Sequence, residues 1–131
     1  MGTSDDIKVA AQRVIDAFGH FDRETYFGCF DPDAIVSFYY EPKVLTLVEY
    51  WAIWRDWEQS GFRVLTCESS NQLIVEVADN VGLLVHDVRT EVVERGENKT
   101  LNERESILLR KRDGDWLVIH EHLSRPEASP S

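Results

Sequence analysis

The first twenty residues repeat apolar side chains at the three-to-four-residue spacing of an amphipathic helix. These apolar residues are Ile7, Ala10, Ala11, Val14, Ile15 and Phe18. Ser4, with two aspartates directly after it, provides the oxygen and the negative charge that favour a helix start, and Gly19 is a typical helix end. A second, short helix is expected from Asp22 to near Phe30, because Asp31-Pro32 prevents its continuation. We expect these two helices to pack as a pair on one face of a sheet.

The middle of the chain changes from a strand pattern to another amphipathic helix. Residues 34–40 are rich in β-branched and aromatic side chains and predict a strand, and residues 44–47 predict a shorter one. From residue 48 to residue 60 the helical period returns, and Gly61 ends it. One stripe of this helix carries Tyr50, Ile53, Trp54 and Trp57. Such a stripe is typical of core and interface packing, and direct stacking of Trp54 on a ligand is the alternative.

After Gly61 the sequence is typical of β-strands joined by short turns. The expected strands are residues 62–68, 73–77, 81–94, 100–112 and 116–124. Turns are indicated at Asp79-Asn80, Gly96-Glu97-Asn98 and Asp113-Gly114. Consecutive strands with short turns form an antiparallel meander, and helices followed by strands indicate the α+β class. We therefore expect one curved antiparallel sheet, wrapped around the helix pair and the third helix.

The last strand, residues 116–124, carries apolar and polar residues on both of its faces. The two-residue period of a strand puts Trp116, Val118, His120, His122 and Ser124 on one face. The other face carries Leu117, Ile119, Glu121 and Leu123. A sheet open to water on one side has one clean polar face, so we expect both faces to be covered, one by the chain's helices and one by a second subunit. A single bulge would exchange the faces, so the pattern leaves open which of them lies inside.

Composition and charge restrict the class of protein. The chain has 131 residues, 43% hydrophobic and 29% charged, which suits one domain, expected over residues 1–124, followed by a flexible tail at 125–131. Fourteen basic and 24 acidic side chains give a net charge of −10, which argues against nucleic acid as a partner. The sequence has no run resembling a membrane span and no secretory pattern at its start, so we expect a cytoplasmic protein without membrane contact. Cys29 and Cys67 have neither disulfide nor metal spacing.

The element order and the last hairpin resemble a known superfamily. Asp31-Pro32 before the first strand and the run from Arg112 to Ser124, RDGDWLVIHEHLS, are similar to the association domain of calcium/calmodulin-dependent protein kinase type two. The order of helix pair, strand, helix and meander resembles the nuclear transport factor 2-like superfamily, in particular its SnoaL-like and ketosteroid-isomerase-like branch. The resemblance implies a cone-shaped, cystatin-like half-barrel, with a pocket closed by helices and a homodimer through the outer sheet face. It implies no single activity, because this fold hosts several enzyme types and non-catalytic modules.

Two positions that carry catalytic aspartates in ketosteroid isomerases hold other residues here. By the resemblance, Phe38 stands at the position of the base and Ser106 at that of the oxyanion-hole aspartate. Neither side chain can move a proton as that reaction requires, so the steroid isomerase mechanism is not expected. Tyr40, near the end of the first strand, could orient a ligand through its hydroxyl, and packing on the strand is the alternative.

The segment Arg104-Glu105-Ser106 resembles the arginine-containing strand of SnoaL-like proteins and limonene-type epoxide hydrolases. An arginine pointing into a cavity would bind a carboxylate, either that of a ligand or that of Glu121. The alternative is a cross-strand surface pair with Glu91 or Glu103, which would contribute only about 0.2–1 kcal/mol. Both interpretations stay open at this level.

Glu121 is the best candidate for a general base if its face of the strand lines the pocket. Burial between Ile119 and Leu123 would then raise its pKa toward neutrality. His122 is a further acid–base candidate. His120 and His122 share a face, but a third ligand is missing from any recognisable spacing, so no metal site is predicted.

The candidate site combines these residues. Catalytic roles are assigned to Glu121, His122 and Arg104, and ligand contacts to Tyr40, Trp54, Ser106, Ile119 and Leu123. The cluster His86-Asp87-Val88-Arg89 is interpreted as a solvated or interfacial strand face. Two functions are compatible with the sequence: a homodimeric domain that binds a small, partly apolar organic ligand and uses acid–base chemistry without a cofactor, or a non-catalytic binding or assembly module.

Overall fold

The structure is a computed structural model that describes residues 2–126. The helices are α1 (Thr3–Gly19), α2 (Arg23–Phe27) and α3 (Leu47–Ser60). The strands are β1 (Phe30–Phe38), β2 (Leu45–Thr46), β3 (Arg63–Ala78), β4 (Val81–Glu94), β5 (Glu97–Arg112) and β6 (Asp115–Ser124). Most of the tail expected at 125–131 lies outside the described residues.

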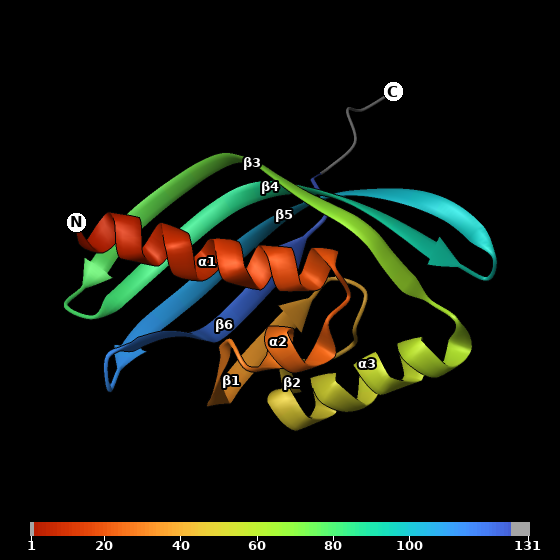
Figure 1. Ribbon diagram of the computed structural model, residues 1–131, viewed down its shortest axis with the longest axis horizontal. Helices are drawn as coiled ribbons and strands as arrows, with labels where there is room; N and C mark the ends of the chain where they lie inside the picture. The colour runs from red at the N-terminus through yellow and green to blue at the C-terminus, as the bar shows by residue number, and fades with distance from the viewer. Residues whose placement is uncertain (1, 127–131) are drawn as a thin grey trace.

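All six strands form one curved sheet with the order β2-β1-β6-β5-β4-β3. Strands β3 to β6 make the expected antiparallel meander, and β1 pairs antiparallel with β2 and parallel with β6. Figure 1 shows α1 lying along the concave side of the sheet, with α2 and α3 beside the β1 end. The expectation of an α+β fold with a curved, unclosed sheet and three helices is confirmed.

Local signals explain the ends of α2 and α3. The Asp22 side chain accepts a hydrogen bond from the Thr25 backbone N–H at 3.2 Å and caps α2. Thr46 and Glu49 form a reciprocal capping box at the start of α3, with distances of 2.9 and 3.2 Å. At its other end Gly61 adopts a φ of +85°, which a residue without a Cβ reaches most easily. These ends agree with the sequence.

Helix α1 and strand β1 begin earlier than expected. Helix α1 starts at Thr3, so Ser4 does not cap it, and the Ser4 hydroxyl donates to Glu76 of β3 at 3.1 Å. Helix α2 ends at Phe27, and β1 already starts at Phe30. The strand tolerates Pro32 because the pairing of β1 with β6 is irregular between Phe30 and Ile35, so no ladder hydrogen bond needs its missing N–H.

Two expected strands, residues 62–68 and 73–77, are one continuous strand, β3. The polar residues between them form a bulge, at which the pairing with β4 shifts between Ser70 and Leu73. The polar run suggested a loop, but the long β4 beside it holds the segment in the sheet.

A second bulge, in β6, decides which side chains face the helices. Leu108 of β5 pairs with His120 while Leu109 pairs with Val118, so Ile119 is an extra residue on β6. Val118 is fully buried, and three residues later Glu121 is also buried. The alternation expected from the sequence therefore breaks at Ile119, and the inner face changes from the set containing Val118 to the set containing Glu121.

The core between helices and sheet is strongly aromatic. Trp54 is completely buried and stacks on Tyr26 and Phe21, with ring centroids 4.8 and 4.9 Å apart. Helix α1 approaches β4 so closely at Gly82 that a Cβ there would lie 2.3 Å from the Ile7 side chain. The glycine is therefore required by the contact between helix and sheet.

The opposite face of the sheet exposes apolar side chains. On β3, Leu73, Val75 and Val77 alternate with inward residues and are 69%, 51% and 53% exposed, and Ile35 on β1 is also exposed. We call Leu73, Val75 and Val77 the outer apolar stripe. No helix of the described part has the length and apolar character needed to cross a membrane.

Candidate functional site

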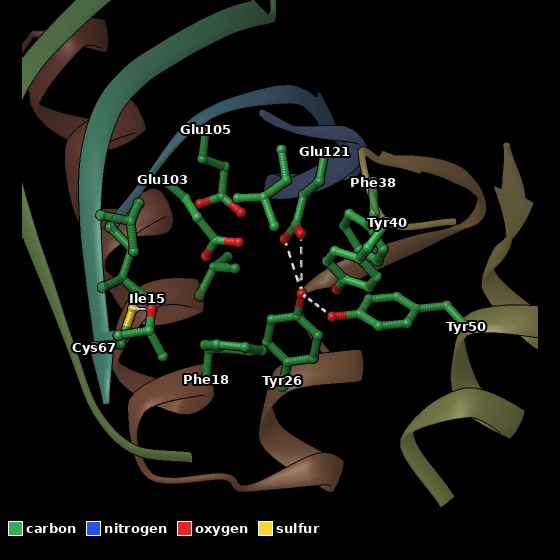
Figure 2. Close-up of a pocket in the computed structure, with 14 residues that line it drawn as sticks. Ile15, Phe18, Tyr26, Phe38, Tyr40, Tyr50, Cys67, Glu103, Glu105 and Glu121 are labelled. Carbon is green, nitrogen blue, oxygen red and sulfur yellow. Dashed lines mark hydrogen bonds between the residues drawn. The ribbon is translucent and has the colours of Figure 1, made fainter. Parts of the chain in front are cut away.

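A cavity of about 40 Å³ lies between the helices and the concave face of the sheet. Its lining residues are Val14, Ile15, Phe18, Tyr26, Phe38, Tyr40, Tyr50, Cys67, Val88, Thr90, Glu103, Glu105, Glu121 and Leu123. We call it the inner cavity. Figure 2 shows the carboxyl groups of Glu103, Glu105 and Glu121 directed toward the same space, with aromatic rings opposite them. All three helices and five of the six strands thus contribute to one small, largely apolar hollow that contains three acidic groups.

Glu121 is held by a chain of tyrosine hydroxyls from two helices. The Tyr26 hydroxyl on α2 donates to both carboxyl oxygens of Glu121 at 3.0 Å, and the Tyr50 hydroxyl on α3 lies 2.9 Å from that of Tyr26. Because the Tyr26 proton points to Glu121, Tyr50 is the donor to Tyr26. The chain orients the carboxyl group and leaves most of its hydrogen-bonding capacity unused.

The position of Glu121 favours its neutral form. Burial raises its pKa well above the ordinary value, and the charge of Glu105 raises it further. The hydrogen bond from Tyr26 acts in the opposite direction and lowers the pKa of Glu121. The surroundings of Glu121 therefore favour the protonated, neutral form of its carboxyl group.

Glu105 is connected to a buried histidine behind the cavity. Burial, followed by the charge of Glu103, raises the pKa of Glu105 to about 8. His86 Nε2 lies 2.8 Å from Glu105 Oε1, and His86 Nδ1 lies 2.6 Å from the Ser69 hydroxyl. Burial lowers the pKa of His86 to about 4, so the contact at neutral pH is a hydrogen bond to a neutral imidazole and not an ion pair.

Glu103 is the third carboxyl group and sits where the cavity opens. It is 5% exposed, and its Oε2 accepts a hydrogen bond from the Tyr39 hydroxyl at 2.7 Å. Burial raises the pKa of Glu103, while the Tyr39 bond and the charge of Arg125 lower it. Glu103 also belongs to the wall of the inner cavity.

A wider hollow continues from the inner cavity. It measures about 300 Å³ and shares Phe18, Tyr40, Thr90, Glu103 and Leu123 with the inner cavity. Its further lining residues are Tyr39, Trp57, Phe62, Val92, Glu94 and Leu101. We call it the outer cavity. The two cavities together form a site with a narrow acidic inner end and a broad, mostly apolar outer part.

Three of the residues assigned to the site from the sequence line the inner cavity. Glu121 points into it from β6, Leu123 follows on the same side of the bulge, and Tyr40 borders both cavities. Trp54 contacts the tyrosines of the site but is fully buried in the core beneath them and is not part of the cavity wall. Its position corresponds to the packing alternative.

Four assigned residues lie away from the cavity. Arg104, Ser106 and His122 are on the outer face of the sheet, where Ser106 pairs with His122, and Ile119 sits in the bulge. The Arg104 Nε–H donates to Asp87 at 3.0 Å, and its side chain is 55% exposed. The sequence had suggested Glu121, Glu91 or Glu103 as the partner of Arg104. In the structure its partner is Asp87.

The histidines also differ from expectation. The strand containing His86 was interpreted as a solvated or interfacial face, but His86 is 1% exposed and only Asp87 and Arg89 point outward. The rings of His120 and His122 lie 6.4 Å apart on the outer face, and His120 Nδ1 is 3.0 Å from the Ile35 carbonyl oxygen. Among residues 2–126 no group of three or more histidine, cysteine or acidic side chains is arranged to hold a metal ion.

Two central residues of the site, Glu103 and Glu105, were missed. On β5 they share the inner face with Ile107 and Leu109, both fully buried. The resemblance directed attention to Arg104 and Ser106, the alternate residues. Extending the alternation back from Ile107 and Leu109 would have identified the two glutamates, but Leu108 is apolar as well and hides the period.

Known structures share this fold at low sequence identity. A ketosteroid isomerase-like protein from Erwinia carotovora atroseptica matches with a TM-score of 0.83 and 15% identity, over 95% of this chain and 97% of that one. An NTF2-like protein from Rhodospirillum rubrum matches with a TM-score of 0.82 and 18% identity, over 94% and 100%. The association domain of C. elegans CaMKII matches with a TM-score of 0.71 and 24% identity, over 92% and 93%. The chain thus has an NTF2-like fold.

The family can be stated more closely than the fold. Residues 7–128 match the SnoaL-like domain, so the chain belongs to the SnoaL-like domain family. A comparison with curated proteins gave no match. The similar structures include an isomerase-like protein and an association domain, so membership of this fold does not choose between catalysis and assembly.

Proposed function

We propose that the protein binds a small, partly apolar organic molecule in the inner and outer cavities and exchanges a proton with it through Glu121 and Glu105, without a cofactor. The observation that carries this proposal is the convergence of carboxyl groups with raised pKa on an otherwise apolar hollow. Buried carboxyls of this kind cost stability, and they are typical of sites that bind or react.

The pKa of Glu105 suits proton transfer at physiological pH. A general acid or base works best when its pKa lies near the operating pH, and the pKa of Glu105 is raised to about 8. We assign Glu121, whose pKa is raised by burial and by the charge of Glu105, as the proton donor, and the ionised fraction of Glu105 as the acceptor. Tyr26 and Tyr50 orient Glu121, and His86 orients Glu105. Arg104, Ser106 and His122 have no part in this proposal.

Deuterium exchange tests the proton transfer directly. A compound found by thermal shift is incubated with the protein in D₂O, and NMR follows the loss of its C–H signals. Wild-type protein should exchange a carbon-bound proton next to an activating group, and Glu121→Gln or Glu105→Gln should lower the exchange rate at least about 100-fold. Glu97→Gln, an exposed change on the same strand β5, is the control and should keep the rate. Equal exchange in all variants would remove the carboxyl pair from the chemistry.

A second function, assembly through the outer sheet face, is supported by the outer apolar stripe. Exposed Leu73, Val75 and Val77 form a contiguous apolar row, which is unusual on a solvated sheet. We propose that this row packs against a second copy of the chain. Analytical ultracentrifugation should find a dimer that Val75→Lys dissociates, while Val48→Lys, at an exposed apolar residue of α3, leaves it intact. A wild-type protein that stays monomeric at about 100 μM would contradict the assembly proposal, because a dimer with a dissociation constant below that concentration would be populated.

A further inference from the structure

We propose that the ligand is a small organic cation, a protonated amine whose ammonium group sits among Glu103, Glu105 and Glu121 and whose apolar part fills the outer cavity. The inference rests on the proposed function in one respect, that the two cavities take a small molecule. It adds the charge of that molecule and its orientation.

The first argument is the charge balance of the site. Four acidic residues line the two cavities, Glu94, Glu103, Glu105 and Glu121, while none of the described lining residues is lysine, arginine or histidine. Of these four, only Glu94 has a cation beside it, Lys99 at 2.6 Å. Arg125, whose charge lowers the pKa of Glu103, lies over the Tyr39 ring and lines neither cavity.

Asp31 is a buried carboxyl group with a structural role, and it provides a comparison within the same chain. Asp31 is fully buried and accepts hydrogen bonds from Arg110 at 2.9 Å and Arg112 at 3.1 Å. A buried charge is tolerated when such partners neutralise it. Glu105 and Glu121 have no arginine or lysine partner among the described residues, so burial favours their neutral forms, and a bound cation would be the partner that lets one of them ionise.

The walls of the inner cavity favour a cation over a neutral hydrogen-bonding group. Aromatic rings from α1, α2, α3, β1 and the turn after β1 line it, namely Phe18, Tyr26, Phe38, Tyr40 and Tyr50. The face of an aromatic ring attracts an ammonium group, and the attraction is stronger in a site without water. Figure 2 shows rings on one side of the hollow and the three carboxyls on the other, so a cation between them would contact both. The Glu103 carboxyl, which lines both cavities, offers it a further acceptor.

The size and polarity of the two cavities set the shape of the ligand. The inner cavity, about 40 Å³, holds little more than a head group, because one water molecule already needs roughly 10–15 Å³ of such space. The outer cavity, about 300 Å³, is lined by Trp57, Phe62, Val92 and Leu101. An alkyl or aryl chain would bury its apolar surface there. The geometry therefore fits an amine with a short apolar substituent.

Binding of such a cation should release a proton. Before binding, Glu105, whose pKa is raised to about 8, holds its proton at pH 7; when the ammonium group enters, this carboxyl ionises, its proton passes to the solvent, and an ammonium–carboxylate pair forms. The other titratable groups facing the pair do not change charge near neutral pH: burial raises the pKa of Tyr26, Tyr50 and Cys67 and lowers that of His86. Tyr40 and Glu103 complete the set that faces the cavity.

The test uses compounds that match in shape and differ in charge. The first set is 2-phenylethylamine, 2-phenylethanol and phenylacetate, and the second is butylamine, butanol and butyrate. Thermal shift with the full chain, at millimolar concentrations, should show stabilisation by an amine and little by its neutral or anionic counterpart. Calorimetry of the amine in phosphate and in Tris, whose ionisation enthalpies differ, should show proton release. Affinity should rise about tenfold between about pH 6.5 and pH 8, as a carboxyl with a pKa near 8 ionises.

Substitutions of the cavity glutamates test whether the amine binds in the inner cavity. Glu103→Gln and Glu105→Gln should each weaken amine binding at least about tenfold, which is about 1.4 kcal/mol. Glu97→Gln, exposed and outside both cavities, should leave it unchanged. Folding of each variant is checked by its own melting curve, and the Glu105→Gln protein should melt at least as high as wild type at pH 8.

The outcomes separate the two proposals. Stabilisation by an alcohol or a carboxylate without stabilisation by an amine would overturn the cation inference and leave the proposed binding function standing. Amine binding that survives Glu103→Gln and Glu105→Gln, or that releases no proton, would also overturn it. Absence of stabilisation by every compound of any charge would overturn both proposals.

Discussion

Replacing Glu105 with glutamine should stabilise the protein increasingly as the pH rises. The Glu105 side chain is 16% exposed, and burial raises its pKa from 4.5 to about 8. Between these two values the carboxyl is ionised in the unfolded chain and protonated in the folded chain. The folded state then binds more protons, so its stability is greatest below about pH 4.5 and is lost as the pH rises toward 8.

The size of the effect follows from the interval of pH. Each pH unit between the two pKa values changes the free energy of unfolding by about 1.4 kcal/mol. From about pH 5.5 to about pH 7.5 the wild-type protein should therefore lose about 2–3 kcal/mol through Glu105. Glutamine has the same shape and can keep a hydrogen bond to His86, but it does not titrate. The stability gap between Glu105→Gln and wild type should widen by that amount.

Urea unfolding, followed by the fluorescence of the four tryptophans, measures this gap at both pH values. Effects of the substitution that do not depend on pH cancel in the comparison. Glu97→Gln, exposed on the same strand, provides the control, and its gap to wild type should stay constant. Parallel stability curves for Glu105→Gln and wild type between the two pH values would refute the assignment of Glu105 as a buried, protonated carboxyl.

Three further predictions concern the supports of the site. Asp31→Asn should cost about 1–3 kcal/mol at pH 7, and in urea unfolding this cost should shrink below about pH 4, because the lowered pKa of Asp31 makes its contribution disappear only in acid. Gly82→Ala should lower the free energy of unfolding by about 1–3 kcal/mol through its collision with Ile7, measured in the same way. Tyr26→Phe removes the donor to Glu121, so an NMR titration should find the pKa of Glu121 raised further.

The helix ends and most of the meander were predictable because their signals are local. Asp22 and Gly61 act on the residues next to them, and the β4 boundaries at Val81 and Glu94 coincide with the expected ones. The parallel pairing of β1 with β6 was not predicted, since it joins segments about eighty residues apart and leaves no mark in either strand. Sequence patterns therefore predict local structure better than they predict which distant strands pair in the sheet.

The site was predicted only in part, and one residue explains much of the difference. The bulge at Ile119 exchanges the faces of β6, so Val118 and Glu121 both point inward although strict alternation separates them. Nothing in the sequence around Ile119 marks the extra residue. On β5 the alternation is regular, but Leu108 is apolar although it lies on the outer face, so the inner face could not be recognised from the sequence. Arg104 was therefore assigned to the site in place of the inward Glu105.

The most direct test of this account is an NMR titration of the carboxyl groups themselves. Protein labelled with ¹³C in its glutamate side chains is titrated, and the signals of Glu105 and Glu121 are assigned by their absence in Glu105→Gln and Glu121→Gln. We predict that Glu105 titrates near pH 8 and that the pKa of Glu121 is well above the ordinary value near 4.3. If every glutamate titrated between about pH 4 and pH 5, Glu105 and Glu121 would not be buried carboxyls without a cationic partner, and the proposed site would be contradicted.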